Sequence, residues 1–195
     1  MSSASEDIAQ AAARLVVDDG LEYGAAKRKA ARDLSRRAGR RSELPSNEAI
    51  EDEVRDYLSL FQADTQPGEL LALRRLALLW MERLQEFRPH LTGAVWRGTA
   101  TRRSAVQIEL YCDDPKAAEI ALIDQRIDYD PVGQPDGPDL LRVDVRCPEL
   151  GESAAIFLHI LDRDDLRGGL KPDARGRTWR GDTPALQRLL QAGAS

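Results

Sequence analysis

The sequence is poor in the residues that most often carry enzyme chemistry. Its 195 residues include two histidines, His90 and His159, and two cysteines, Cys112 and Cys147. No C-x-x-C pair is present, and the histidines do not supply zinc ligands at a usual spacing. Neither histidine has a recognisable serine or cysteine partner, which disfavours a hydrolytic triad. We expect two buried free thiols, His159 as a core or sheet residue, and no metal site.

Long hydrophobic runs and targeting signals are also missing. No uninterrupted apolar stretch approaches the roughly 18 residues that a membrane span requires. The N-terminal residues lack the cationic and apolar regions of a secretory signal. With 42% hydrophobic and 31% charged residues, the chain has enough apolar material for a core of ordinary size. We expect a cytoplasmic protein without a membrane segment.

Charge is unevenly distributed. The formal net charge is −5, a mildly acidic value that disfavours nucleic acid as a partner. Residues 27–41, however, contain eight basic residues and one acidic residue. Arg28, Arg32 and Arg36 share one side of the expected helix, a spacing that suits a polyanion as well as a solvated surface. Binding of nucleic acid is therefore unlikely on composition but stays open for this stretch.

Apolar periodicity predicts helices through the first half of the chain. Expected helices cover residues 5–18 and 22–38, with Gly20 ending the first and Gly39 the second. Ser46 or Asn47 is a good N-cap for a third helix, which carries an apolar stripe up to Phe61. A fourth and more apolar helix begins at Pro67.

After Pro89 the spacing of apolar residues changes from the helical period to the two-residue period of strands. Residues 104–112 alternate between an apolar and a polar face, and Asp114-Pro115 begins a short helix. An extended piece at 126–130, a Pro/Gly-rich loop, strands at 140–147 and 154–161 and a last helix from about Thr183 to Gln191 follow. The second of these strands is nearly continuously apolar, so we expect it to lie inside the sheet.

This order of elements predicts an α+β fold with a mixed sheet flanked by helices. We expect a helical N-terminal region at 1–66 and an α+β domain at 67–195.

The segment from Gly93 to Leu110 contains a glycine and arginine motif. The residues that form this motif are Gly93, Arg97, Gly98, Ala100 and Ser104. In this register the segment resembles the G-S-x-x-R-G-x-A-x-x-x-S-D-x-D signature of the minimal nucleotidyltransferases, in the DNA polymerase β superfamily. The resemblance implies a nucleotidyltransferase-like fold and a nucleotide-binding role for Gly93, Arg97, Gly98 and Ser104.

The sequence departs from this signature at the positions that carry the chemistry. The two metal-binding aspartates of the family fall on Ala105 and Gln107, and its first serine falls on Ala94. Alanine and glutamine lack the anionic oxygens that Mg²⁺ prefers. A third family carboxylate would fall on Asp144, or less well on Asp128 or Asp130. The resemblance thus implies a protein that binds a nucleotide, or a protein partner, without nucleotidyl transfer.

Two alternatives stay open. An active, Mg²⁺-dependent transferase on an unknown acceptor would need Glu109, Asp113 or Asp144 to replace the missing aspartates, although Glu109 suits a solvated strand and Asp114 suits a helix cap. A protein-interaction or polyanion-binding module would instead use the N-terminal helices at 5–62. In the 168–182 loop, Trp179 lies between arginines and either stacks on a base or pins the loop.

Overall fold

The computed structural model describes residues 4–38, 43–133, 139–166, 172–173 and 175–193. The chain forms two compact units. The first contains residues 1–70 and 99–104, and the second contains residues 71–98 and 105–195. The sequence predicts one boundary at residue 66, whereas the chain crosses between the units three times. A segment between two elements of the second unit thus belongs to the first.

The first unit is helical. It contains α1 (Ala4–Asp19), α2 (Tyr23–Ala38), α3 (Asn47–Phe61) and the first residues of α4 (Gln66–Arg83). The Ser46 side chain accepts the Ala49 N–H and caps α3, so Ser46 rather than Asn47 is the N-cap among the two predicted candidates. Apolar side chains spaced by three or four residues form the core of this unit, and the fully buried ones include Ile8, Ala12, Val16, Ile50 and Val54.

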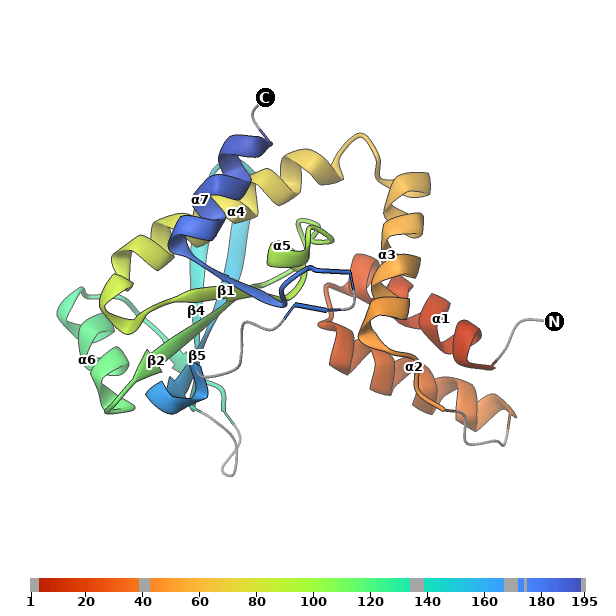
Figure 1. Ribbon diagram of the computed structural model, residues 1–195, viewed down its shortest axis with the longest axis horizontal. Helices are drawn as coiled ribbons and strands as arrows, with labels where there is room; N and C mark the ends of the chain where they lie inside the picture. The colour runs from red at the N-terminus through yellow and green to blue at the C-terminus, as the bar shows by residue number, and fades with distance from the viewer. Residues whose placement is uncertain (1–3, 39–42, 134–138, 167–171, 174, 194–195) are drawn as a thin grey trace. The chain divides into compact units, whose positions relative to one another are not determined.

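The second unit is built on a six-stranded mixed sheet in the order β3-β4-β5-β2-β1-β6 (Figure 1). The strands are β1 (His90–Thr92), β2 (Val106–Cys112), β3 (Asp130–Pro131), β4 (Asp139–Cys147), β5 (Glu152–Asp162) and β6 (Arg180–Asp182). Among the described strands, the β2–β5 pair is parallel and the other four pairs are antiparallel. The predicted α+β fold with a mixed sheet is confirmed, and β5 lies inside the sheet as expected.

The two faces of this sheet differ in chemistry. Val106, Ile108 and Leu110 of β2 are fully buried, as are Ile156 and Leu158 of β5. Helices α4, α6 (Lys116–Asp124) and α7 (Thr183–Ala192) add further buried apolar side chains to the core of this unit, among them Leu73, Met81, Leu122 and Leu186. Gln107, Glu109 and Tyr111 occupy the alternate positions of β2 and therefore share the opposite, polar face.

Several short elements differ from the expectations. The predicted extended piece at 126–130 overlaps the two-residue strand β3 at Asp130 alone. The three-residue strands β1 and β6 and the five-residue helix α5 (Gly93–Arg97) are stabilised by tertiary contacts that no local pattern predicts. The 3-10 helices η1 (Gln85–Phe87) and η2 (Arg163–Leu166) complete the unit. Parts of the predicted loops, at 134–138 and 167–171, and the end of the basic stretch at 39–41 lie outside the described residues.

Both cysteines are free and buried, as expected. Within the described part of the chain, no helix is both long enough and apolar enough to cross a membrane.

Candidate functional site

The glycines of the motif surround α5. Gly93 follows β1 with φ of +68°, and Gly98 caps the other end of α5 with φ of +83°. Both values lie in the left-handed region that glycine adopts at little cost. The sequence therefore places a tight turn on each side of a single helical turn, which fixes the direction in which Trp96 and Arg97 leave the backbone.

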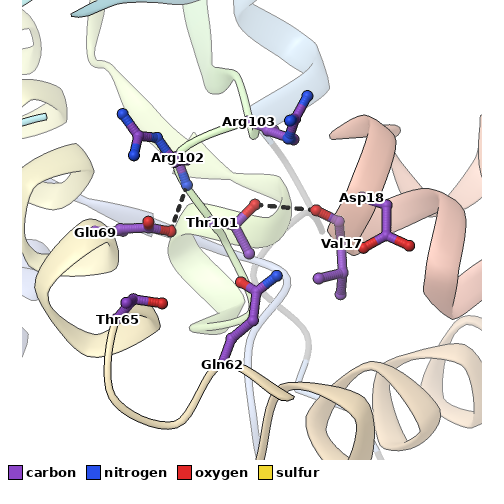
Figure 2. Close-up of a pocket in the computed structure, with 8 residues that line it drawn as sticks. All are labelled: Val17, Asp18, Gln62, Thr65, Glu69, Thr101, Arg102 and Arg103. Atoms are coloured by element: carbon purple, nitrogen blue, oxygen red, sulfur yellow. Dashed lines mark hydrogen bonds between the residues drawn. The ribbon is translucent and has the colours of Figure 1, made fainter. Parts of the chain in front are cut away.

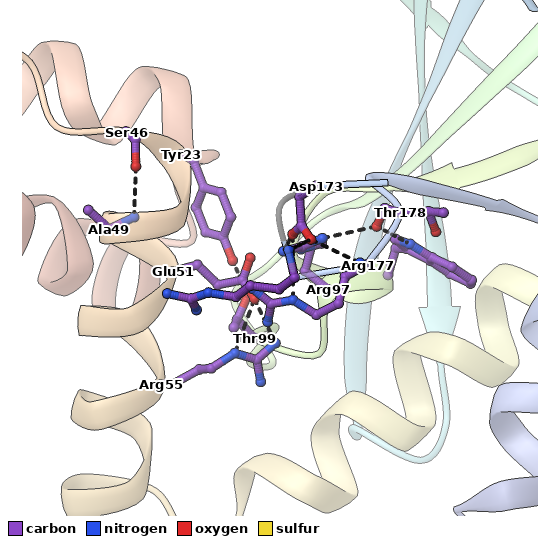
Figure 3. A network of polar contacts seen from close by, with 12 residues as sticks. Tyr23, Ser46, Ala49, Glu51, Arg55, Arg97, Thr99, Asp173, Arg177 and Thr178 are labelled. Carbon is purple, nitrogen blue, oxygen red and sulfur yellow. Dashed lines mark hydrogen bonds and ion pairs between the residues drawn. The ribbon is translucent and has the colours of Figure 1, made fainter. Parts of the chain in front are cut away.

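Arg97 points into the protein. Its guanidinium donates to the Asp173 carboxylate at 2.9 Å and to the Thr178 carbonyl at 3.0 Å (Figure 3). It also lies over the Trp179 ring, 4.1 Å from the centroid. The side chains of the ion pair are 2% and 1% exposed. Arg97 therefore holds the segment around Asp173 in place. Its contact with the Trp179 ring favours a role for Trp179 in pinning the loop over a role in stacking on a base.

The Asp173 carboxylate is surrounded by hydrogen-bond donors. Burial by itself raises the pKa of its carboxyl group. Hydrogen bonds from the Arg177 and Arg175 backbone N–H groups and from the Arg97 side chain outweigh that effect and lower the pKa to about 2. The carboxylate is therefore charged at neutral pH, as its ion pair requires.

A pocket of about 360 Å³ opens beside α5. Arg74 from α4 fixes its wall by donating to the Val95 and Trp96 carbonyls at 3.1 and 3.2 Å. The Trp96 indole N–H donates to the Thr178 carbonyl at 2.9 Å. Together, guanidinium groups and an indole suit an anionic ligand that carries a ring. The lining residues include Arg74, Trp96, Arg97, Arg177, Thr178 and Leu189.

Gln107 occupies the position of a metal-binding aspartate in the resemblance. Its side-chain oxygen accepts a hydrogen bond from His159 Nε2, at 2.6 Å, across the parallel β2–β5 pair. Burial lowers the pKa of His159, against the opposing charge of Glu109, so the imidazole is neutral at pH 7. His159 lies in the sheet as expected. An amide and a neutral imidazole thus occupy this part of the polar face.

Glu109 is mostly buried, with 14% of its side chain exposed, rather than solvated as the strand pattern predicts. Its carboxylate accepts the Tyr111 hydroxyl at 2.7 Å and pairs with Arg180 at 2.7 Å. Arg180 also contacts the Tyr111 hydroxyl. Burial, reinforced by Glu109, raises the pKa of Tyr111, which therefore stays protonated and donates.

The other candidate carboxylates are occupied elsewhere. Asp144 on β4 pairs with Arg142 at 2.9 Å, and β5 separates it from β2, a distance of about 10 Å across two strand spacings. Asp113 pairs with Arg163. Asp114 accepts the Lys116 N–H at 2.9 Å, and α6 begins at Lys116, close to the predicted start.

Two further aspartates, Asp128 and Asp130, are exposed at or near the edge strand β3. Among the described residues, no group of three His, Cys, Asp or Glu side chains is arranged to hold a metal ion.

The predicted nucleotide-binding residues fall in both units. Gly93, Arg97 and Gly98 lie together at α5, in the second unit. Ser104 belongs to the first unit, where its hydroxyl oxygen accepts the Thr101 N–H at 3.0 Å. Sequence reasoning missed Arg74, Trp96 and Asp173, which come from separate elements. The sequence predicts His159 as a core or sheet residue but does not predict its bond to Gln107.

The basic helix α2 is partly bound to its own unit. Lys27 donates to the Pro45 carbonyl and the Asn47 side chain at 3.2 and 3.0 Å, and Lys29 pairs with Asp19 at 3.1 Å. The arginines at 28, 32 and 36 are exposed.

No family model, curated protein or solved structure matches this chain.

Proposed function

We propose that this chain is a nucleotidyltransferase-like protein that binds a nucleotide without transferring it. This proposal rests on the polar face of the sheet, where the side chains of β2 already have bonding partners within the protein. Gln107 is bonded to His159, and Glu109 is bonded to Tyr111 and Arg180. Because each group already has a partner of matching chemistry, none is left to bind two Mg²⁺ ions.

The pocket beside α5 supports the nucleotide part of the proposal. Phosphate oxygens match the guanidinium groups of its wall, and a base matches the Trp96 indole. Its volume of about 360 Å³ accommodates part of a nucleotide. Gly93 and Gly98 act here by placing Trp96, and Arg97 by fixing the wall opposite it.

Isothermal titration with ATP, GTP, CTP and UTP, with and without Mg²⁺, tests this function. We expect one triphosphate to bind equally well in both conditions and to release no pyrophosphate. Leu189→Glu places a carboxylate in the pocket and should weaken binding by about tenfold or more. Gln191→Glu, an exposed change on the same helix, should leave it unchanged. Pyrophosphate release would disprove the loss of transfer, and no binding would disprove the nucleotide pocket.

A protein partner is the second candidate. Leu60 and Phe61, at the end of α3, are 75% and 69% exposed, which is unusual for large apolar side chains. A photo-crosslinking amino acid at position 61 should capture one defined protein, whereas the same group at the polar position Asp64 should not. Equal labelling at both positions would contradict this candidate.

A further inference from the structure

The first unit contains a pocket of about 370 Å³ that plays no part in the proposed nucleotide site. It lies between the end of α1, the corner between α3 and α4, and the turn at 101–103 (Figure 2). Polar and charged side chains dominate its lining, and they include Asp18, Gln62, Thr65, Glu69, Arg102 and Arg103. A cavity of this size is at the lower end of the range of about 300–1,000 Å³ found for small-molecule sites.

The turn that bears the two arginines is held firmly. The Ser104 N–H donates to the Thr101 carbonyl at 2.8 Å, and the Ser104 hydroxyl accepts the Thr101 N–H at 3.0 Å. The Thr101 hydroxyl donates to the Val17 carbonyl at 3.3 Å, and the Arg102 N–H donates to Glu69 at 2.8 Å. Because these bonds fix the backbone, Arg102 and Arg103 leave it from defined positions.

Gly20 provides the space that this turn needs. Its φ is +69°, and a Cβ atom built on it would lie 2.0 Å from the Arg103 carbonyl oxygen. No other residue type permits so close an approach of two backbone segments. The glycine that ends α1 therefore also positions the arginine turn.

Charges of both signs line the pocket without neutralising each other. Within the described parts of the chain, Asp18, Glu69 and Arg103 form no ion pair. Asp18 accepts only a long hydrogen bond, 3.4 Å, from the Tyr57 hydroxyl. Glu69 uses one oxygen for the Arg102 N–H. The pocket thus offers both anionic and cationic partners to a ligand.

The corner between α3 and α4 adds neutral hydrogen-bonding groups. The side chains of Gln62 and Thr65 make no hydrogen bond to any described residue, and both line the pocket. An amide and a hydroxyl can each donate and accept, so they suit ligand groups of either kind.

We propose that this pocket binds a small zwitterion, a free α-amino acid. A simple anion would meet the carboxylates of the lining, and a simple cation would meet the Arg103 guanidinium. A ligand that carries a carboxylate and an ammonium group matches both signs, with the carboxylate at Arg103 and the ammonium group at Asp18. Each contact is then a charge-assisted hydrogen bond.

The full chain tests this proposal with chemically matched probes. Each standard amino acid at about 10 mM is screened by thermal shift, and the one that gives the largest shift is titrated calorimetrically. We expect a Kd of about 1 mM or tighter, weakened about tenfold or more by N-acetylation and again by amidation of the carboxylate. The absence of binding would overturn the proposal. So would equal binding of the acetylated form, of inorganic phosphate or of the amide, because the site would then need one charge only.

Variants locate the binding site. Asp18→Asn and Arg103→Gln remove one charge at exposed positions and should each weaken binding about tenfold, with an unchanged circular dichroism spectrum. Asp19→Asn and Arg14→Gln are matched controls on α1 that do not line the pocket. Binding that survives both pocket variants would overturn the assignment, as would an equal loss in the controls.

Discussion

The two units use their charged side chains differently. In the second unit, carboxylates on or near the sheet are paired with arginines, namely Asp173 with Arg97, Glu109 with Arg180 and Asp144 with Arg142. In the pocket of the first unit, Asp18, Glu69 and Arg103 form no ion pair with described residues. The most buried pair, Arg97 with Asp173, is one that the protein could not leave unpaired, because a lone buried charge is costly.

This difference separates structural charges from charges that can bind a ligand. Arg97, which already pairs with a buried carboxylate, has little left to offer a ligand. A charge at a pocket wall, still solvated, exchanges water for ligand at a smaller cost. Arg97 of the motif thus stabilises the second unit, whereas the pocket charges Asp18, Glu69 and Arg103 lie in the first unit.

The largest expected effect comes from Gly20→Ala. The left-handed φ and the overlap with the Arg103 carbonyl together should lower the free energy of unfolding by about 3 kcal/mol. Denaturant unfolding followed by circular dichroism measures the change. Gly68→Ala is the matched control, because no atom lies within 4 Å of its Cβ position, and it should stabilise α4 by about 0.5–1 kcal/mol. Equal effects would show that the arginine turn is not held at Gly20.

A smaller effect should distinguish two carboxylates of the sheet. Glu109→Gln breaks a mostly buried bond to Arg180 and should cost about 2 kcal/mol. Asp144→Asn breaks an exposed pair with Arg142 and should cost less than about 0.5 kcal/mol. The same proteins test the active-transferase alternative, since a folded Asp144→Asn protein that lost a transferase activity would support it.

The smallest effect is a pH dependence due to Asp173. Its pKa of about 2 in the folded protein lies below the ordinary value of 3.8. The folded state is therefore favoured above the ordinary pKa, and this contribution is lost as pH falls from about 4 towards 2. Urea unfolding at pH 5, 4 and 3 should show this decline, and Asp173→Asn should flatten it. A decline of the same slope in the variant would assign the acid sensitivity to other carboxylates.

Much of the fold follows from local patterns. The helices at 5–18 and 22–38 are predicted to within a few residues, and the N-cap of α3 is one of the two predicted candidates, because apolar spacing and capping act over one or two turns. The strands predicted at 140–147 and 154–161 are confirmed as β4 and β5, because the apolar pattern of a strand is also local. The short strands β1 and β6 could not be predicted, because three residues carry no period and their stability comes from pairing with each other and with β2.

The site is less predictable than the fold. A motif specifies that an arginine stands at position 97 but not which way it points. Its partner Asp173 is 76 residues away in the sequence, and the partner of Gln107, His159, is 52 residues away. The charged pocket of the first unit is built from three separate segments. Contacts of this kind depend on the tertiary fold, which one sequence does not reveal.

The return of residues 99–104 to the first unit has a consequence for how the protein is made. A ribosome synthesises residues 1–70 before it reaches Thr99, the hydroxyl partner of the buried Tyr23, or the turn that packs on Gly20. The emerging helices must therefore wait for part of the second unit before their own core closes. A fragment cut at residue 70 should be a poor soluble product, whereas an internal fusion that joins residues 1–70 directly to 99–104 should recover it.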